Sequence, residues 1–202
     1  MLRGVILGIL VGFLLVFLGV YYYFASGKAP VTTKSPEMPF EHKFAHMAQH
    51  AYMEKQPHLQ PPIPEDEKTF LEGSKVYKDH CAVCHGLPGQ PKTMIAEGMF
   101  PPPPQLFRGT GVTDDESWET YWTVFGGIRM TGMPGFSEQL GETKIWQVSL
   151  LLKNADKLSP TVLSALTSTE TLSSPAATAP PAATTPPPAA ASPNPAAPAT
   201  TH

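Results

Sequence analysis

The chain has 202 residues and a formal net charge of −3, and it contains 24 prolines but only 2 cysteines. A small negative charge argues against binding to nucleic acid, which depends on a basic surface. Two cysteines are too few for a disulfide framework or a cysteine-held cluster, and so many prolines argue against one compact domain over the whole length.

The N-terminal segment, residues 1–27, is predicted to be a transmembrane helix. Residues 5–24 carry no charge, and this length crosses a bilayer as a helix. Arg3 before it and Lys28 after it give only a weak orientation signal, whereas the three tyrosines at 21–23 suit an aromatic belt. A cleaved signal peptide is the alternative, although its apolar core is usually shorter. Either reading sends the following residues across the cytoplasmic membrane of a bacterium, to the periplasmic face.

Residues 28–64 are predicted to be a Pro-rich tether, interrupted by one short helix within 40–55. His42, His46 and His50 recur every four residues, so they would form one stripe on that helix. Such a stripe could bind a divalent metal, sense pH or provide a ligand to another subunit's cofactor. A plain polar helix face is the favoured reading, because no carboxylate or cysteine stands at ligand spacing.

Residues 65–158 have helical patterning in three stretches. The first helix is expected at 65–80, opening with acidic residues that suit the positive end of its dipole. The second is expected at 114–125, after a capping-box pattern in Thr113–Glu116. The third, at 142–154, repeats apolar residues at helical spacing.

The first of these helices runs directly into Cys81-Ala-Val-Cys84-His85. A Cys-x-x-Cys-His run is the attachment motif of a c-type haem. Two cysteines three positions apart on one turn can each form a thioether to the porphyrin edge, and the histidine is then aimed at the iron as its proximal ligand. The pattern predicts one covalent haem.

Three other uses of these residues are weaker. A thioredoxin-like pair needs a βαβ setting, and nothing nearby reads as a strand. A zinc site that adds His80 would need two pairs of adjacent residues on one small tetrahedron. A disulfide across so short a loop would leave His85 without a role.

The C-terminal segment, residues 159–202, consists almost entirely of Pro, Ala, Thr and Ser. Such a composition buries too little apolar surface to offset the entropy of ordering, so this tail is predicted to be disordered.

Residues 65–158 resemble a class I cytochrome c, a small all-α haem domain. The resemblance is carried by residues 77–86 around the haem motif, Pro104-Gln-Leu106, residues 127–136 and the aromatic Trp146 of the last helix. It implies one covalently bound haem c. It also implies that Gly73 and Tyr77 of the first helix cross closely with the Trp146 region, which closes the fold.

The resemblance also implies the remaining site residues. Met133 stands in Gly-Met-Pro, as the family's sixth iron ligand does, whereas Met130 is assigned to packing. The backbone of Pro104 should accept the second ring N–H of His85. Arg129 either pairs with a haem propionate or is an ordinary surface arginine. Met94 and Met99 are more remote ligand candidates.

Two function classes follow. A His/Met-ligated haem predicts a membrane-anchored carrier of single electrons in a respiratory or photosynthetic chain, not an enzyme. Its partners would be membrane-bound or periplasmic redox proteins, or neighbouring subunits of a larger complex. The alternative is a haem enzyme or sensor with an open iron position, acting on peroxide or gases.

Overall fold

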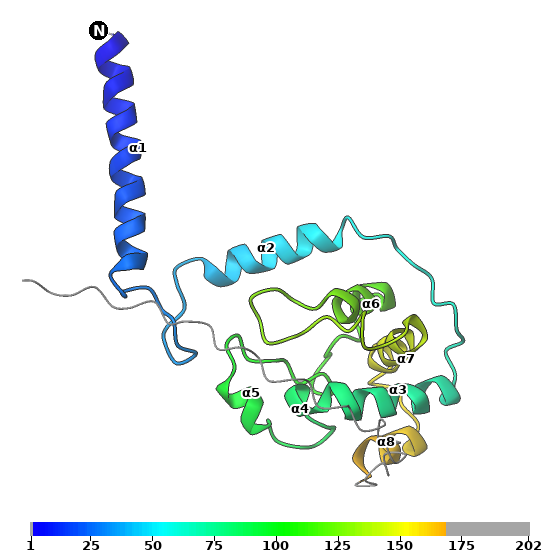
Figure 1. The fold of residues 1–202 in the computed structure, drawn as a ribbon. Coiled ribbons are helices and arrows are strands. Elements are labelled where there is room, and N and C mark those ends of the chain that lie inside the picture. The colour runs from blue at the N-terminus through cyan, green and yellow to red at the C-terminus, as the bar shows by residue number, and fades with distance from the viewer. Residues whose placement is uncertain (1, 169–202) are drawn as a thin grey trace, which may run out of the picture. The chain divides into compact units, whose positions relative to one another are not determined.

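The computed structural model describes residues 2–168, and every regular element in that range is a helix (Figure 1). An all-α fold is therefore confirmed. The helices in chain order are α1 (Leu2–Ala25), α2 (Glu41–Met53), α3 (Glu67–His80), α4 (Ala82–His85), α5 (Met94–Gly98), α6 (Ser117–Gly126), α7 (Glu142–Lys153) and α8 (Pro160–Thr167).

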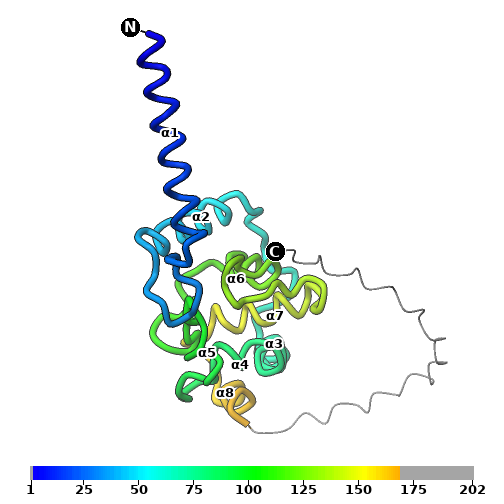
Figure 2. The backbone as a smooth tube through the Cα atoms, turned by 60° about the vertical axis from the view of Figure 1, so that its left-hand side comes forward, coloured from blue at the N-terminus to red at the C-terminus, as the bar shows by residue number. Residues whose placement is uncertain are grey.

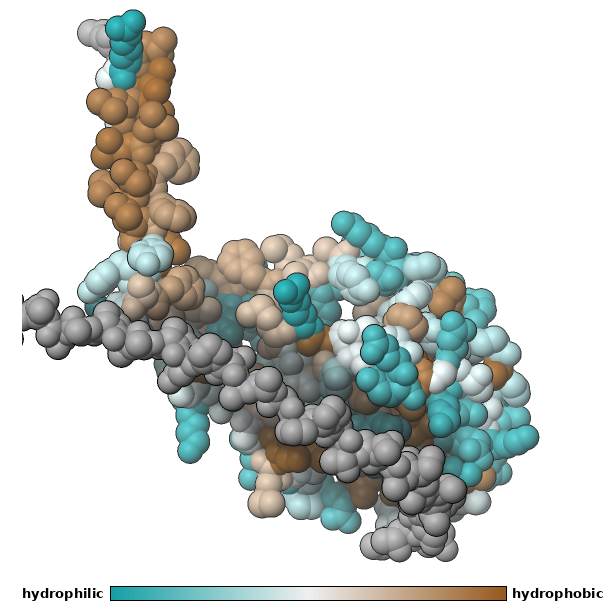
Figure 3. Space-filling view, viewed as in Figure 1, coloured by the Kyte–Doolittle hydropathy of each residue, from teal (hydrophilic) through white to brown (hydrophobic). Residues whose placement is uncertain are grey.

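Helix α1 is long and apolar enough to cross a membrane, and none of its residues is buried. Among residues 2–168 it is the one helix that meets this description. Figure 3 shows it as an almost continuous apolar rod. Its length and composition fit a membrane anchor, and a signal sequence near the N-terminus has the same properties.

The core lies where α3 crosses α7, with α6 on the other side of α7 (Figure 1). Gly73 permits the crossing, because a Cβ at this position would overlap the backbone carbonyl of Gln147. Tyr77 and Trp146 are buried beside it, and Trp146 stacks on Tyr121 of α6 with ring centroids 4.3 Å apart. The predicted close crossing of Gly73 and Tyr77 with the Trp146 region is confirmed.

Two helix starts differ from expectation. Helix α3 begins at Glu67, because Asp66 is its N-cap and accepts the Thr69 N–H at 2.8 Å. The predicted capping box of Thr113 and Glu116 is wrong by one turn. Glu116 is itself the N-cap of α6, and its backbone N–H donates to Glu119 Oε2 at 2.8 Å.

The predicted disordered tail begins too early, because α8 occupies part of it. Ser159 is the N-cap of this helix, and Pro160 is its first residue. Val162 and Leu166, one turn apart, are completely buried, and α8 lies against α3 (Figure 2). These two side chains supply the apolar surface that the rest of the segment lacks. The remainder of the predicted tail, 169–202, lies outside the described residues.

We expect a chain that ends at Leu158 to be far less stable than the full chain. Burying one aliphatic side chain is worth about 1.5–3 kcal/mol, so loss of Val162 and Leu166 should lower the free energy of unfolding by roughly 3–6 kcal/mol. Denaturant unfolding followed by circular dichroism measures the change. A chain that ends at Ser168 is the control and should match the full chain; equal stability of both truncations would show that α8 contributes nothing.

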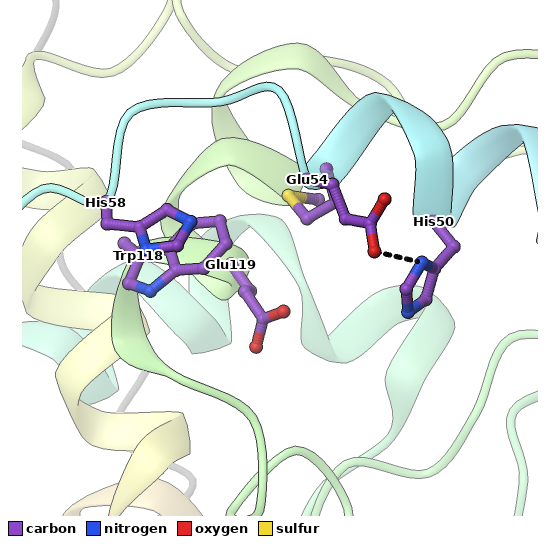
Figure 4. A pocket seen from close by; sticks show the side chains of 6 residues that line it. His50, Glu54, His58, Trp118 and Glu119 are labelled. Carbon is purple, nitrogen blue, oxygen red and sulfur yellow. Dashed lines mark ion pairs between the residues drawn. The ribbon is translucent and has the colours of Figure 1, made fainter.

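The end of the predicted tether packs on α6 and the core. We call residues 57–63 the docked segment. The indole N–H of Trp122 donates to Pro57 O at 3.0 Å, and the His58 ring stacks on Trp118 at 4.2 Å (Figure 4). Leu59 also packs against the core, as does Ile63. The folded domain therefore begins before Glu65, the residue at which its N-terminal boundary was predicted.

Candidate functional site

The Cys-x-x-Cys-His motif forms a single helical turn at the end of α3. The Cys81 carbonyl accepts the backbone N–H of Cys84 at 3.1 Å and of His85 at 2.9 Å. Gly86 then leaves the helix with φ 75°, and its carbonyl accepts the buried Tyr77 hydroxyl at 2.7 Å. The turn is therefore fixed to α3 at both ends, and both cysteines lie on it as the motif requires.

One ring nitrogen of His85, Nδ1, is hydrogen-bonded, and the other, Nε2, is available to bind a metal. Its Nδ1 lies 2.8 Å from the carbonyl oxygen of Pro104. Because a carbonyl can only accept, Nδ1 carries the proton and Nε2 keeps its lone pair. Burial lowers the pKa of His85, although the Pro104 contact opposes this shift. Burial therefore favours the neutral imidazole, which is the form that binds a metal.

The cysteine thiols are free and half-buried. Burial raises the pKa of the Cys81 thiol to about 12, with a contribution from Cys84. A thiol held neutral in this way is not the reactive thiolate on which a redox pair depends. Residues 2–168 contain no strand for a thioredoxin-like setting, and no three His, Cys, Asp or Glu side chains among them could hold a metal ion.

Met133 lies on a closed loop between α6 and α7. The Ile128 N–H donates to Met133 O at 3.2 Å, and the Thr131 hydroxyl accepts the Met133 N–H at 3.1 Å. Gly127, at φ 67°, lies so close to the backbone at Gly135 that a Cβ would overlap it. Met133 itself is half-buried and packs against the core. The loop therefore holds the Met133 backbone on both sides.

Two neighbours of Met133 on this loop, Met130 and Arg129, are both exposed. Met130 is 92% exposed with φ 63°, so its assignment to packing is wrong. Met130 is not among the side chains that pack against the core, whereas Met133 is. Arg129 is exposed and forms no salt bridge within residues 2–168. Its role toward a propionate stays a prediction.

Two contacts join separate parts of the site. The His80 ring, just before Cys81, meets the Phe136 ring of the Met133 loop edge-on, with centroids 5.9 Å apart. The tip of Met99 lies against Gly132, where a Cβ would overlap it. Sequence reasoning considered Met99 only as a remote ligand. No local signal could place it here, because its partner lies far along the chain.

These residues fit a covalently bound haem. Attachment needs two thiols on one turn, and Cys81 and Cys84 provide them. The iron needs a neutral imidazole, and His85 offers Nε2. A thioether ligand is available at Met133, on a loop that the His80–Phe136 contact brings beside the motif.

The histidine stripe of α2 has ordinary contacts. The His42 and His46 rings lie 4.2 Å apart, and His50 pairs with Glu54 at 3.4 Å (Figure 4). An open pocket of about 250 Å³ lies between this end of α2 and the start of α6, and it also borders Trp118. As noted above, the described residues contain no group of side chains that could hold a metal, so the metal reading has no support.

Comparison with known proteins gives one family. Residues 68–150 match the family described as cytochrome C oxidase, cbb3-type, subunit III. The match covers α3 to most of α7 and includes the haem motif, Pro104 and the Met133 loop. Neither the curated proteins nor the solved structures compared with the chain gave a match.

Proposed function

Because residues 68–150 form a class I cytochrome c domain, we propose that this protein is a membrane-anchored mono-haem cytochrome that carries single electrons in a respiratory or photosynthetic chain. A domain of this family serves electron transfer with covalently bound haem c. When bound, the haem supplies an iron centre that takes up and releases one electron. The observation in this chain that most supports the proposal is the hydrogen bond between His85 and Pro104.

Each site residue has a proposed task. Cys81 and Cys84 form the thioether attachments, and His85 binds the iron through Nε2 while Pro104 holds the ring. Met133 occupies the sixth position, which leaves no open site for a substrate. Arg129 pairs with a propionate.

The partners and location are proposed from the family and from α1. The matched family is named after an oxidase subunit, which supports redox partners within a larger membrane complex. Helix α1 anchors the chain in the cytoplasmic membrane with the haem domain on the periplasmic face. Acidic side chains outnumber basic ones between 65 and 157, so basic partner surfaces suit it, with steering that weakens as salt rises.

An optical spectrum of the full-length holoprotein tests the electron-carrier proposal. A weak methionine-to-iron charge-transfer band in the near infrared of the oxidised protein is the expected result. A high-spin spectrum that changes when cyanide or carbon monoxide is added would instead indicate an open iron position, and the carrier proposal would then be wrong.

We expect Cys84→Ala to weaken or abolish covalent haem retention, because one of the two thioethers cannot form. His85→Ala should prevent low-spin iron, since the proximal imidazole is lost. Extraction of denatured protein with acidified organic solvent measures retention, and the wild-type protein should keep its haem. Release of haem from the wild type would contradict covalent attachment.

A further inference from the structure

Helix α2 carries an apolar stripe that no described residue covers. Phe44, Met47 and Ala51 of α2 recur at spacings of three and four, so they share one face of the helix, and the ring of the N-cap residue Phe40 lies 6.3 Å from that of Phe44. The exposed fractions are 67% for Phe40, 59% for Phe44 and 57% for Met47, and no residue of α2 is buried. We call these four residues the α2 stripe.

The α2 stripe is not the side that α2 turns toward the rest of the protein. The partly shielded positions of the helix are Glu41, Gln49 and Met53, which lie on a different face. Met53 and the neighbouring His50 line the pocket against α6. Apolar side chains are visible on the outer surface over α2 (Figure 3).

The remaining surface of α2 is polar and carries little negative charge. His42, His46 and His50 lie on a separate face that adjoins Met53, with Lys43 between this face and the α2 stripe. The only carboxylate within α2, Glu41, accepts the backbone N–H of Met38 at 2.8 Å. This helix therefore combines an aromatic apolar face with a polar face whose charged side chains are Glu41 and Lys43, the two-faced pattern of helices that lie in a membrane surface.

We propose that α2 lies in the membrane–water interface, with the α2 stripe inserted among the lipids. The inference rests on the proposed anchoring by α1. That helix ends at Ala25, and only residues 26–40 separate it from α2, so the bilayer is the apolar phase nearest along the chain. Insertion removes the Phe and Met side chains from water, while the side of α2 that carries Met53 and His50 stays turned toward α6.

A lipid surface fits the α2 stripe better than a second protein does. A stable protein–protein interface buries roughly 800 Å² on each partner. Three side chains of a 13-residue helix and the Phe40 ring before it supply only a fraction of that area. A bilayer imposes no such minimum, because α1 already holds α2 close to the surface and the stripe adds to an existing attachment.

Photo-crosslinking of the full-length holoprotein in nanodiscs of phosphatidylcholine and phosphatidylglycerol tests the proposal. A benzophenone amino acid replaces Phe44 in one sample, Met47 in a second and His46 in a third, which is the matched control on the polar face. A fourth sample carries the probe at Leu14 and reports insertion of α1. The haem absorbance verifies folding in each, and mass spectrometry identifies the adducts.

The proposal expects lipid adducts from the probes at Phe44, Met47 and Leu14, and no lipid adduct from the probe at His46. Lipid adducts at Leu14 but none at Phe44 and Met47 would overturn it while leaving the anchor intact. Crosslinks from Phe44 to a second copy or back to the haem domain would overturn it as well. No lipid adduct at Leu14 would overturn the proposed anchoring, and the position of α2 in the interface would fall with it.

Discussion

Replacing Met133 by histidine should keep the haem iron six-coordinate and lower its reduction potential by a large margin. A thioether opposite histidine favours ferrous iron, whereas a second imidazole stabilises the ferric form. Axial ligation spans roughly 0.8 V among haem proteins, and the Met133→His change should account for a substantial part of that range. Redox titration of the full-length holoprotein, followed by its visible absorption, measures the shift.

Met130→Leu is the matched control for this prediction. Met130 is also a methionine of the 127–136 loop, but its side chain is 92% exposed. The potential and the near-infrared band should therefore stay as in the wild type. If Met130→Leu removed the methionine band while Met133→Leu spared it, the ligand assignment would be reversed.

Gly73→Ala should strongly destabilise the haem domain. The added Cβ would overlap the carbonyl oxygen and carbon of Gln147, which belong to the backbone of α7 and cannot rotate away. Helices α3 and α7 would have to separate at the crossing that buries Tyr77 and Trp146. Overpacking of this kind costs about 3 kcal/mol or more where the backbone cannot adjust. Denaturant unfolding of the holoprotein measures the loss.

Gly98→Ala is the corresponding control. Gly98 also lies in a helix, α5, and a Cβ there would meet no atom within 4 Å. The substitution should be neutral or stabilise by roughly 0.4–1 kcal/mol, because alanine restricts the unfolded chain. Equal destabilisation by both substitutions would contradict the close contact between α3 and α7.

The parts of the molecule that depend on short-range pattern could be predicted from the sequence. Cys81, Cys84 and His85 lie on one turn because their spacing is that of one turn, and α3, α6 and α7 end within a few residues of the expected places. The close approach at Gly73 followed from the family resemblance, because only glycine allows two backbones so near each other.

Other parts depend on contacts between distant residues. The Gly-Met-Pro setting distinguished Met133 from Met130 in the sequence, but no local pattern indicated that Met130 would have left-handed backbone and an exposed side chain. The contact of His58 with Trp118 joins residues that no local pattern relates. Helix α8 did have a signal, in the Ser159–Pro160 start and in Val162 and Leu166 one turn apart, but the surrounding Ala and Thr residues obscured it.

The docked segment also limits the distance that the haem domain can move from helix α1. The local concentration that a tethered reactant offers its neighbours depends on the free length of the chain that holds it. Pro57 is bound to Trp122 and Leu59 packs against the core, so residues 57–63 add nothing to that length. The 13 residues of α2 shorten the arm further, because a helix rises only about 1.5 Å per residue. If α1 anchors the chain as proposed, electron acceptors close to the membrane surface would meet the haem often, while those that stand farther out from the membrane would stay beyond its reach.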